Sequence, residues 1–93
     1  MARTNNSFKM YSDPGHGWLA VRLSDLEDVG LTTESFSNYS YRKGKTVYLE
    51  EDCDADIFAR AWQKKFSAPI HLIEKFTNKR SPIRGYYCIR DFA

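Results

Sequence analysis

Short blocks of apolar residues alternate with polar turns along this chain, a spacing that favours strands over long helices. Residues 7–13 carry Phe8, Met10 and Tyr11 among polar neighbours. The turn at 13–15 is Asp-Pro-Gly, in which proline presets its own φ and glycine accepts a positive φ. Residues 18–23 resume as a second strand, so the pattern predicts a β-hairpin near the start of the chain.

Two short helices are predicted, one after each of the first two hairpins. Ser24 and Glu27 have the spacing of a capping box, in which each side chain binds the backbone amide of the other residue, and Gly30 ends this first helix. Asp52 or Asp54 can cap the second helix, because a carboxylate there accepts backbone N–H groups. The apolar stripe of the second helix consists of Ile57, Phe58, Ala61, Trp62 and Phe66.

Two more hairpins complete the predicted fold. In the first, an aromatic strand over 36–41 and an alternating strand over 46–51 flank a polar glycine turn. In the second, a strand over 70–76 precedes a turn and a strand over 83–92 that is bent at Gly85. The element order is therefore ββα-ββα-ββ, an α+β domain with both helices on one face of a mainly antiparallel sheet.

Composition indicates one domain. The 93 residues are 42% hydrophobic and 15% aromatic, which suits a single core over 7–93 after a flexible tail over 1–6. A formal net charge of +2 gives little overall attraction to nucleic acid or to an anionic membrane. No apolar run approaches the ~20 residues of a membrane span, and the polar start is unlike a signal sequence, so we expect a cytoplasmic protein without a membrane partner.

Cys53 and Cys88 are the two cysteines, and they lie far apart in the sequence. They lack the close spacing of a zinc-binding pair, and isolated thiols in a reducing compartment are mostly packed side chains. The sequence does not decide whether they form a disulfide, although a reducing compartment argues against one.

The sharpest enzymatic hypothesis rests on Asp13 and His16, which share one tight loop. Such a pair can act as a base on Cys53 or on a water, provided that separate segments converge. The simpler interpretation is that Asp13 accepts backbone hydrogen bonds in an Asx-type turn and that His16 is a solvated tip. Turn propensity accounts for nearly every residue in the loop, so no catalytic residue is predicted.

Carboxylates gather before the second helix, at Glu50, Glu51, Asp52, Asp54 and Asp56. Oxygen ligands suit calcium or magnesium, but the spacing departs from the calcium-binding loop because it has no mid-loop glycine and no closing glutamate. Acids before a helix commonly meet its positive end instead. We therefore predict no metal ion and no other cofactor.

Direct nucleic-acid binding is an alternative function. Tyrosines lie near two basic turns, and exposed aromatic faces can stack on bases while basic groups hold phosphates. The match to the signature strand of an RNA-binding sheet is poor. The basic residues assigned to this alternative are Arg42, Lys43, Lys45, Lys79, Arg80 and Arg84.

Several stretches resemble small proteins encoded by phages and other mobile elements. They are residues 11–19 (YSDPGHGWL), 39–41 (YSY) with Gly44, 47–54 (VYLEEDCD) and 84–85 (RG). The resemblance covers most of the chain from Tyr11 onward. It implies a genomic setting rather than a mechanism, and it assigns no catalytic residue.

This setting favours an interaction protein over an enzyme. We expect the chain to bind and modulate, by inhibition, a host protein such as a defence effector or a nucleic-acid-processing enzyme. Trp18 is central if it is exposed, because tryptophan is enriched in binding hot spots, and it is simply core if it is buried. The final strand can be a free sheet edge that pairs with another copy. The residues assigned to partner binding are Asp13, His16, Trp18, Glu50, Glu51, Asp52 and Asp54.

Overall fold

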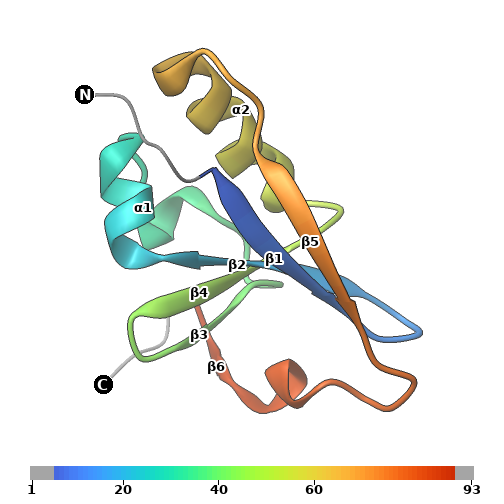
Figure 1. Ribbon diagram of the computed structural model, residues 1–93. Helices are drawn as coiled ribbons and strands as arrows, with labels where there is room; N and C mark the ends of the chain where they lie inside the picture. Colours follow the sequence, from blue (N-terminus) through green and yellow to red (C-terminus); the bar gives the residue numbers. More distant parts are fainter. Residues whose placement is uncertain (1–5, 90–93) are drawn as a thin grey trace.

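Six strands in one mixed sheet and two α-helices make up the described residues, 6–89, of the computed structural model (Figure 1). In chain order the elements are β1 (Ser7–Ser12), β2 (Gly17–Arg22), α1 (Leu23–Asp28), the 3₁₀ helix η1 (Thr33–Ser35), β3 (Tyr41–Lys43), β4 (Thr46–Glu50), α2 (Ala55–Phe66), β5 (His71–Phe76), the 3₁₀ helix η2 (Pro82–Gly85) and β6 (Tyr87–Cys88). The predicted α+β class is confirmed. Among residues 6–89, no helix has the length and apolar character needed to cross a membrane.

The strands follow the order β5-β1-β2-β4-β3-β6 across the sheet. Neighbours within residues 6–89 are antiparallel except β1 and β5, which run parallel, so the mainly antiparallel sheet is confirmed. The predicted hairpin between the last two strands is wrong, because β5 and β6 lie at opposite edges. After α2 the chain returns beside β1, and the segment through η2 then carries it to β3 (Figure 1).

One face of the sheet is closed by both helices. The register places Leu19 opposite Leu49 and Val21 opposite Val47, and all four side chains are buried. Phe8 of β1 meets two rings of α2 edge to face, with centroid separations of 5.1–5.2 Å. The helices contribute Leu26, Ala55, Phe58 and Trp62 to this core.

The two helix starts differ from the predicted caps. The N-cap of α1 is Arg22 rather than Ser24, and the Asp25 carboxylate accepts the Arg22 amide at 2.9 Å. Gly30 adopts a φ of +77° just after this helix, as a terminating glycine does. Asp54 stands at the N-cap of α2 but makes no side-chain capping bond, because Ser37 and Ser40 occupy its carboxylate.

Two predicted strands differ from the observed ones. The strand predicted over 36–41 overlaps β3 only at Tyr41, because residues 36–40 form turns that are held against Asp54. Arg42 and Lys43, expected in the turn, belong to the strand instead. The last predicted strand, 83–92, begins as η2 and is extended only at β6, while its residues 90–92 lie outside the described part of the chain.

The second face of the sheet is aromatic. Strand pairing sets Trp18 beside Tyr11 and Glu50, and Tyr48 beside Tyr41, all on the side opposite Leu49. The segment around η2 covers part of this face, where Ile83 is buried and Tyr86 contacts Tyr48 at 5.2 Å between ring centroids. The functional candidates lie at one end of this covered region.

Candidate functional site

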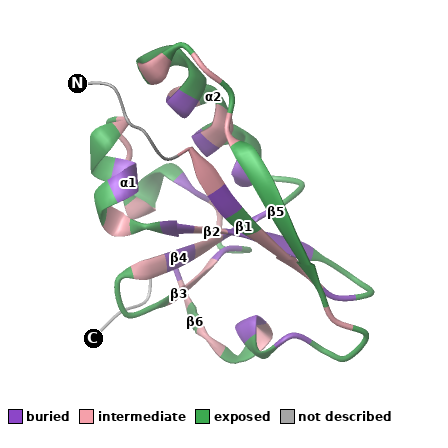
Figure 2. Ribbon diagram, in the orientation of Figure 1, coloured by how far each residue is buried: buried purple, intermediate pink, exposed green. Residues whose placement is uncertain are grey.

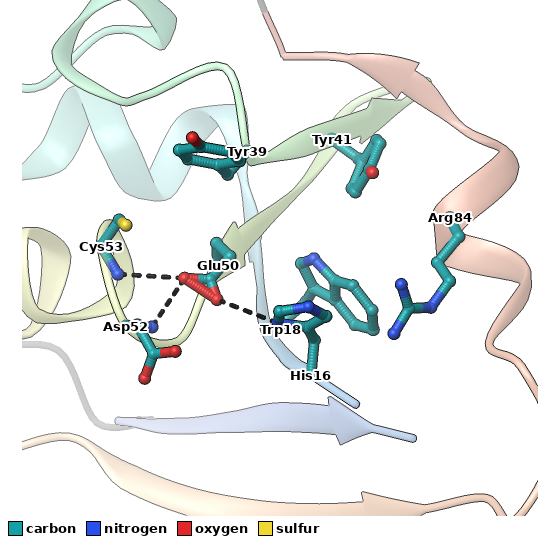
Figure 3. Close-up of a pocket in the computed structure, with 8 residues that line it drawn as sticks. All are labelled: His16, Trp18, Tyr39, Tyr41, Glu50, Asp52, Cys53 and Arg84. Atoms are coloured by element: carbon teal, nitrogen blue, oxygen red, sulfur yellow. Dashed lines mark hydrogen bonds and ion pairs between the residues drawn. The ribbon is translucent and has the colours of Figure 1, made fainter. Parts of the chain in front are cut away.

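Four segments that are distant in sequence meet at a pocket on the second face (Figure 3). They are the β1–β2 loop with the start of β2, the chain leading into β3, the corner between β4 and α2, and the η2 segment. The pocket has a volume of about 260 Å³. Its lining residues are His16, Trp18, Tyr39, Tyr41, Glu50, Asp52, Cys53 and Arg84.

Asp13 and Arg84 join the β1–β2 loop to η2. Arg84 donates from Nε to one carboxylate oxygen at 2.7 Å and from Nη2 to the other at 2.9 Å. The amides of Gly15, His16 and Ser81 donate to the same carboxylate at 2.9–3.0 Å. The Arg84 hydrogen bonds, followed by that of the Ser81 amide, hold the pKa of Asp13 far below its usual value. The predicted Asx-type turn is therefore present, and its aspartate is also an ion-pair partner.

Arg84 lies over Trp18, with its guanidinium carbon 5.3 Å from the ring. Trp18 is 2% exposed, so it is a core residue and not an exposed hot spot. A Cβ at Gly15 would stand 2.8 Å from Arg84 Nη2, so a side chain there would displace the end of the guanidinium from its present position. The indole Nε1 is buried and has no hydrogen-bond acceptor among the described residues.

Glu50 is the buried carboxylate of the pocket, with a side chain 8% exposed. Its Oε1 accepts the amides of Asp52 at 2.8 Å and of Cys53 at 3.1 Å, which shapes the corner before α2. Its Oε2 accepts no hydrogen bond from the described residues and lies 3.8 Å from Nδ1 of His16. Figure 3 shows the imidazole directed at this oxygen.

The hypothetical Asp13–His16 catalytic pair is not formed. The Asp13 oxygens face Arg84 and backbone amides, and the carboxylate nearest the His16 ring belongs to Glu50. Cys53 does line the same pocket, but desolvation and then the neighbouring carboxylates, that of Glu50 foremost, raise the pKa of its thiol. A raised pKa disfavours the nucleophilic thiolate. Neither cysteine forms a disulfide within residues 6–89.

Asp54 and Glu51, both assigned to partner binding from the sequence, lie outside the pocket. Asp54 is buried and accepts hydrogen bonds from the Ser37 amide at 3.0 Å, from the Ser37 hydroxyl at 2.7 Å and from the Ser40 hydroxyl. It anchors the chain before β3 and offers no surface to a partner. Glu51 is exposed, and its carboxylate lies beside Gly17, where a Cβ would be 2.7 Å from Oε2.

Sequence reasoning missed Tyr39 and Tyr41 as members of this site, and it assigned Arg84 to nucleic acid. Tyr39 is 68% exposed at the pocket, and Tyr41 packs on Trp18 at 6.2 Å between ring centroids. The sequence signal was an aromatic cluster next to a basic turn, which suggested nucleic-acid contacts. The β3–β4 register places Tyr41 near the acidic corner, and the hydrogen bonds of Ser37 and Ser40 to Asp54 place Tyr39 there.

The basic residues assigned to nucleic acid do not form one group. Lys43 lies over the Tyr86 ring at 5.0 Å, on the second face. Arg42 is opposite Val47 in the register and thus on the other face, with its Nε bonded to the Gly44 carbonyl. Arg84 is engaged by Asp13, and together with Arg80 it lines a shallow hollow beside the β1–β2 loop. Lys45 and Lys79 are exposed in turns.

Comparison with protein-family models, with curated proteins and with solved structures finds no match to this chain.

Proposed function

We propose that this chain is a small interaction protein that binds and modulates another protein through the pocket beside Trp18. The observation that carries the proposal is Tyr39, an aromatic ring 68% exposed on the wall of a pocket formed by four distant segments. Tyrosine is enriched in binding hot spots, because it buries a large apolar surface at little entropic cost.

The size and rigidity of the pocket support a protein partner. A volume of about 260 Å³ is below the ~300–1,000 Å³ of most small-molecule sites, so a single side chain of a partner fits better than a whole cofactor. The bidentate Asp13–Arg84 pair fixes the β1–β2 loop before binding. Such preorganisation lowers the entropic cost of association.

Unpaired polar atoms also support a binding role. Trp18 Nε1 is a buried donor and Glu50 Oε2 is a buried acceptor, and neither has a hydrogen-bond partner within residues 6–89. Buried polar groups without partners are uncommon in folded proteins, and they often mark functional sites. In the proposed setting, which follows from the resemblance to phage proteins, the partner is a host protein of the cytoplasm such as a defence effector or a nucleic-acid-processing enzyme.

The test is affinity capture from bacterial lysate with the tagged chain, with and without nuclease, at low and moderate salt, read by quantitative mass spectrometry. We expect one defined protein to survive both treatments and its recovery to fall by at least about tenfold with Tyr39→Ala.

Tyr87→Ala is the matched control. Tyr87 is 74% exposed but is opposite Arg42 in the register, on the other face of the sheet. Its replacement is expected to leave capture unchanged. An equal loss of captured protein with both variants, or undiminished capture by Tyr39→Ala, would contradict a recognition role for the pocket.

Nucleic-acid binding is the second candidate, and one observation favours it. Tyr11, Tyr48 and Tyr86 form a row of ring contacts on the second face, 5.2–6.3 Å between centroids, with the Lys43 ammonium above the last ring. If single-stranded nucleic acid lies on this row, its affinity falls steeply as the salt concentration rises. Lys43→Ala then reduces the slope of log affinity against log salt concentration by about one, which is the contribution of one phosphate contact. Fluorescence anisotropy with a labelled single-stranded oligonucleotide measures the affinity and its salt dependence. Lys64→Ala on α2 is the control. A slope that both variants leave unchanged rules out this surface.

A further inference from the structure

We propose that His16, Glu50 and Asp52 form a binding site for a divalent transition-metal ion, for which zinc is the best match. The three side chains lie on the acidic side of the pocket, where each offers one ligand atom and all three atoms are within 4.8 Å of one another. Metal binding is a property of the chain alone, so this inference is independent of any protein partner.

The separations are close to those of a coordination sphere. Ligand atoms about 2.1 Å from a tetrahedral ion stand roughly 3.4 Å apart. His16 Nδ1 and Glu50 Oε2 are already 3.8 Å apart. The His16 side chain is 51% exposed, and Asp52 is also exposed, so small side-chain rotations can close the remaining distance.

Glu50 provides the independent evidence for a ligand. Its side chain is more than nine-tenths buried, and its Oε2 faces His16 without a hydrogen-bond donor from the described residues. A buried acceptor without a partner carries an uncompensated desolvation penalty. The amides of Asp52 and Cys53 hold the other oxygen, Oε1, and so orient Oε2 toward the imidazole. Outer contacts that orient a ligating carboxylate in this way are typical of metal sites.

The donor set indicates the kind of metal. One imidazole nitrogen with two carboxylate oxygens suits zinc and its neighbours in the first transition row, whereas magnesium and calcium prefer oxygen ligands alone. Three protein ligands leave a coordination position for water or for a group from outside. The acid cluster seen in the sequence lacked this nitrogen, because His16 is on a different hairpin and reaches Glu50 only through the β2–β4 pairing.

The test is isothermal titration calorimetry of the purified chain with zinc chloride near pH 7, with magnesium chloride as the comparison ion. We expect one zinc ion per chain and no magnesium binding at the same concentrations. His16→Ala and Glu50→Gln are each expected to weaken zinc affinity by at least about tenfold, as loss of a ligand does. The glutamine can still accept the Asp52 and Cys53 amides, and thermal unfolding without metal checks that both variants are folded.

Two controls separate this site from other zinc ligands. His71→Ala removes the other histidine, exposed on β5, and Cys53→Ser removes the nearby thiol. Both are expected to keep affinity within about twofold of the parent. As a direct readout, the imidazole nitrogen resonances of His16 should shift on zinc addition while those of His71 do not. Absence of one-to-one binding, full affinity in His16→Ala, or loss of binding with Cys53→Ser or His71→Ala would overturn the proposal.

Discussion

Asp13, Glu50 and Asp54 are buried carboxylates that make different sets of contacts. Asp13 accepts hydrogen bonds from a guanidinium and from backbone amides, and Asp54 accepts them from the hydroxyls of two serines. Glu50 has one oxygen without a donor among the described residues. Asp13 and Asp54 therefore use both oxygens to stabilise the fold, whereas Glu50 uses Oε1 for this and leaves Oε2 without a donor. The difference cannot be seen in the residue type, because all three are acids next to turns.

The Asp13 carboxylate should make folding sensitive to acid. Because its pKa in the folded chain is far below the ordinary 3.8, the stabilisation is complete above about pH 5 and is lost progressively as the pH falls below that ordinary value. We expect Asp13→Asn to lower the melting temperature at pH 7 and to flatten the decline between about pH 5 and pH 2. Circular-dichroism melts across this range measure both effects.

Asp56→Asn is the matched control for Asp13. Asp56 pairs with Arg60 at 2.7 Å on the surface of α2, with side chains 64% and 82% exposed. Exposed pairs contribute little to stability, so this variant should melt like the parent at pH 7. A melting temperature that Asp13→Asn leaves unchanged would show that the buried ion pair does not hold the loop.

At the scale of elements, β5 is the least protected part of the sheet. It is an edge strand whose six residues are all exposed, as Figure 2 shows along its length. Ile73 is 39% and Phe76 is 64% exposed. β6 is the opposite edge but spans only two residues, so the self-pairing edge expected of the final strand is better provided by β5. An apolar edge with free backbone groups can pair with a second chain.

We expect concentration-dependent dimerisation through β5, measured by sedimentation equilibrium. Ile73→Lys should weaken the dimer by at least about tenfold, because a charge on an edge strand opposes pairing. Ile57→Lys on α2 is the control, since Ile57 has the same 39% exposure away from the sheet edge. A chain that stays monomeric at high concentration, or equal effects of the two lysines, would contradict dimerisation at this edge.

At the scale of the whole molecule, the two faces of the sheet differ in how they are closed. Both helices close the first face with a continuous apolar core. Within residues 6–89, only the segment around η2 covers the second face, and it leaves hollows lined by tyrosines and charged groups. The proposed partner and metal sites lie on this second face, because no α-helix within residues 6–89 packs against its aromatic and acidic side chains.

The sequence by itself determined those local elements that depend on short-range signals. Proline and glycine in turns set the first two hairpins, and apolar residues at helical spacing set α2, because these signals act between residues a few positions apart. The loop at Asp13 was likewise predictable as an Asx-type turn, since its backbone acceptor bonds span two or three residues.

Only the tertiary structure decided how these pieces meet. Asp13 and Arg84 are 71 residues apart in the sequence, and no local preference pairs them. The parallel pairing of β5 with β1, the burial of Trp18 and the approach of His16 to Glu50 likewise depend on strand order and register. These are set by the joint burial of apolar surface across the whole sheet, so the pocket became visible only in the folded chain.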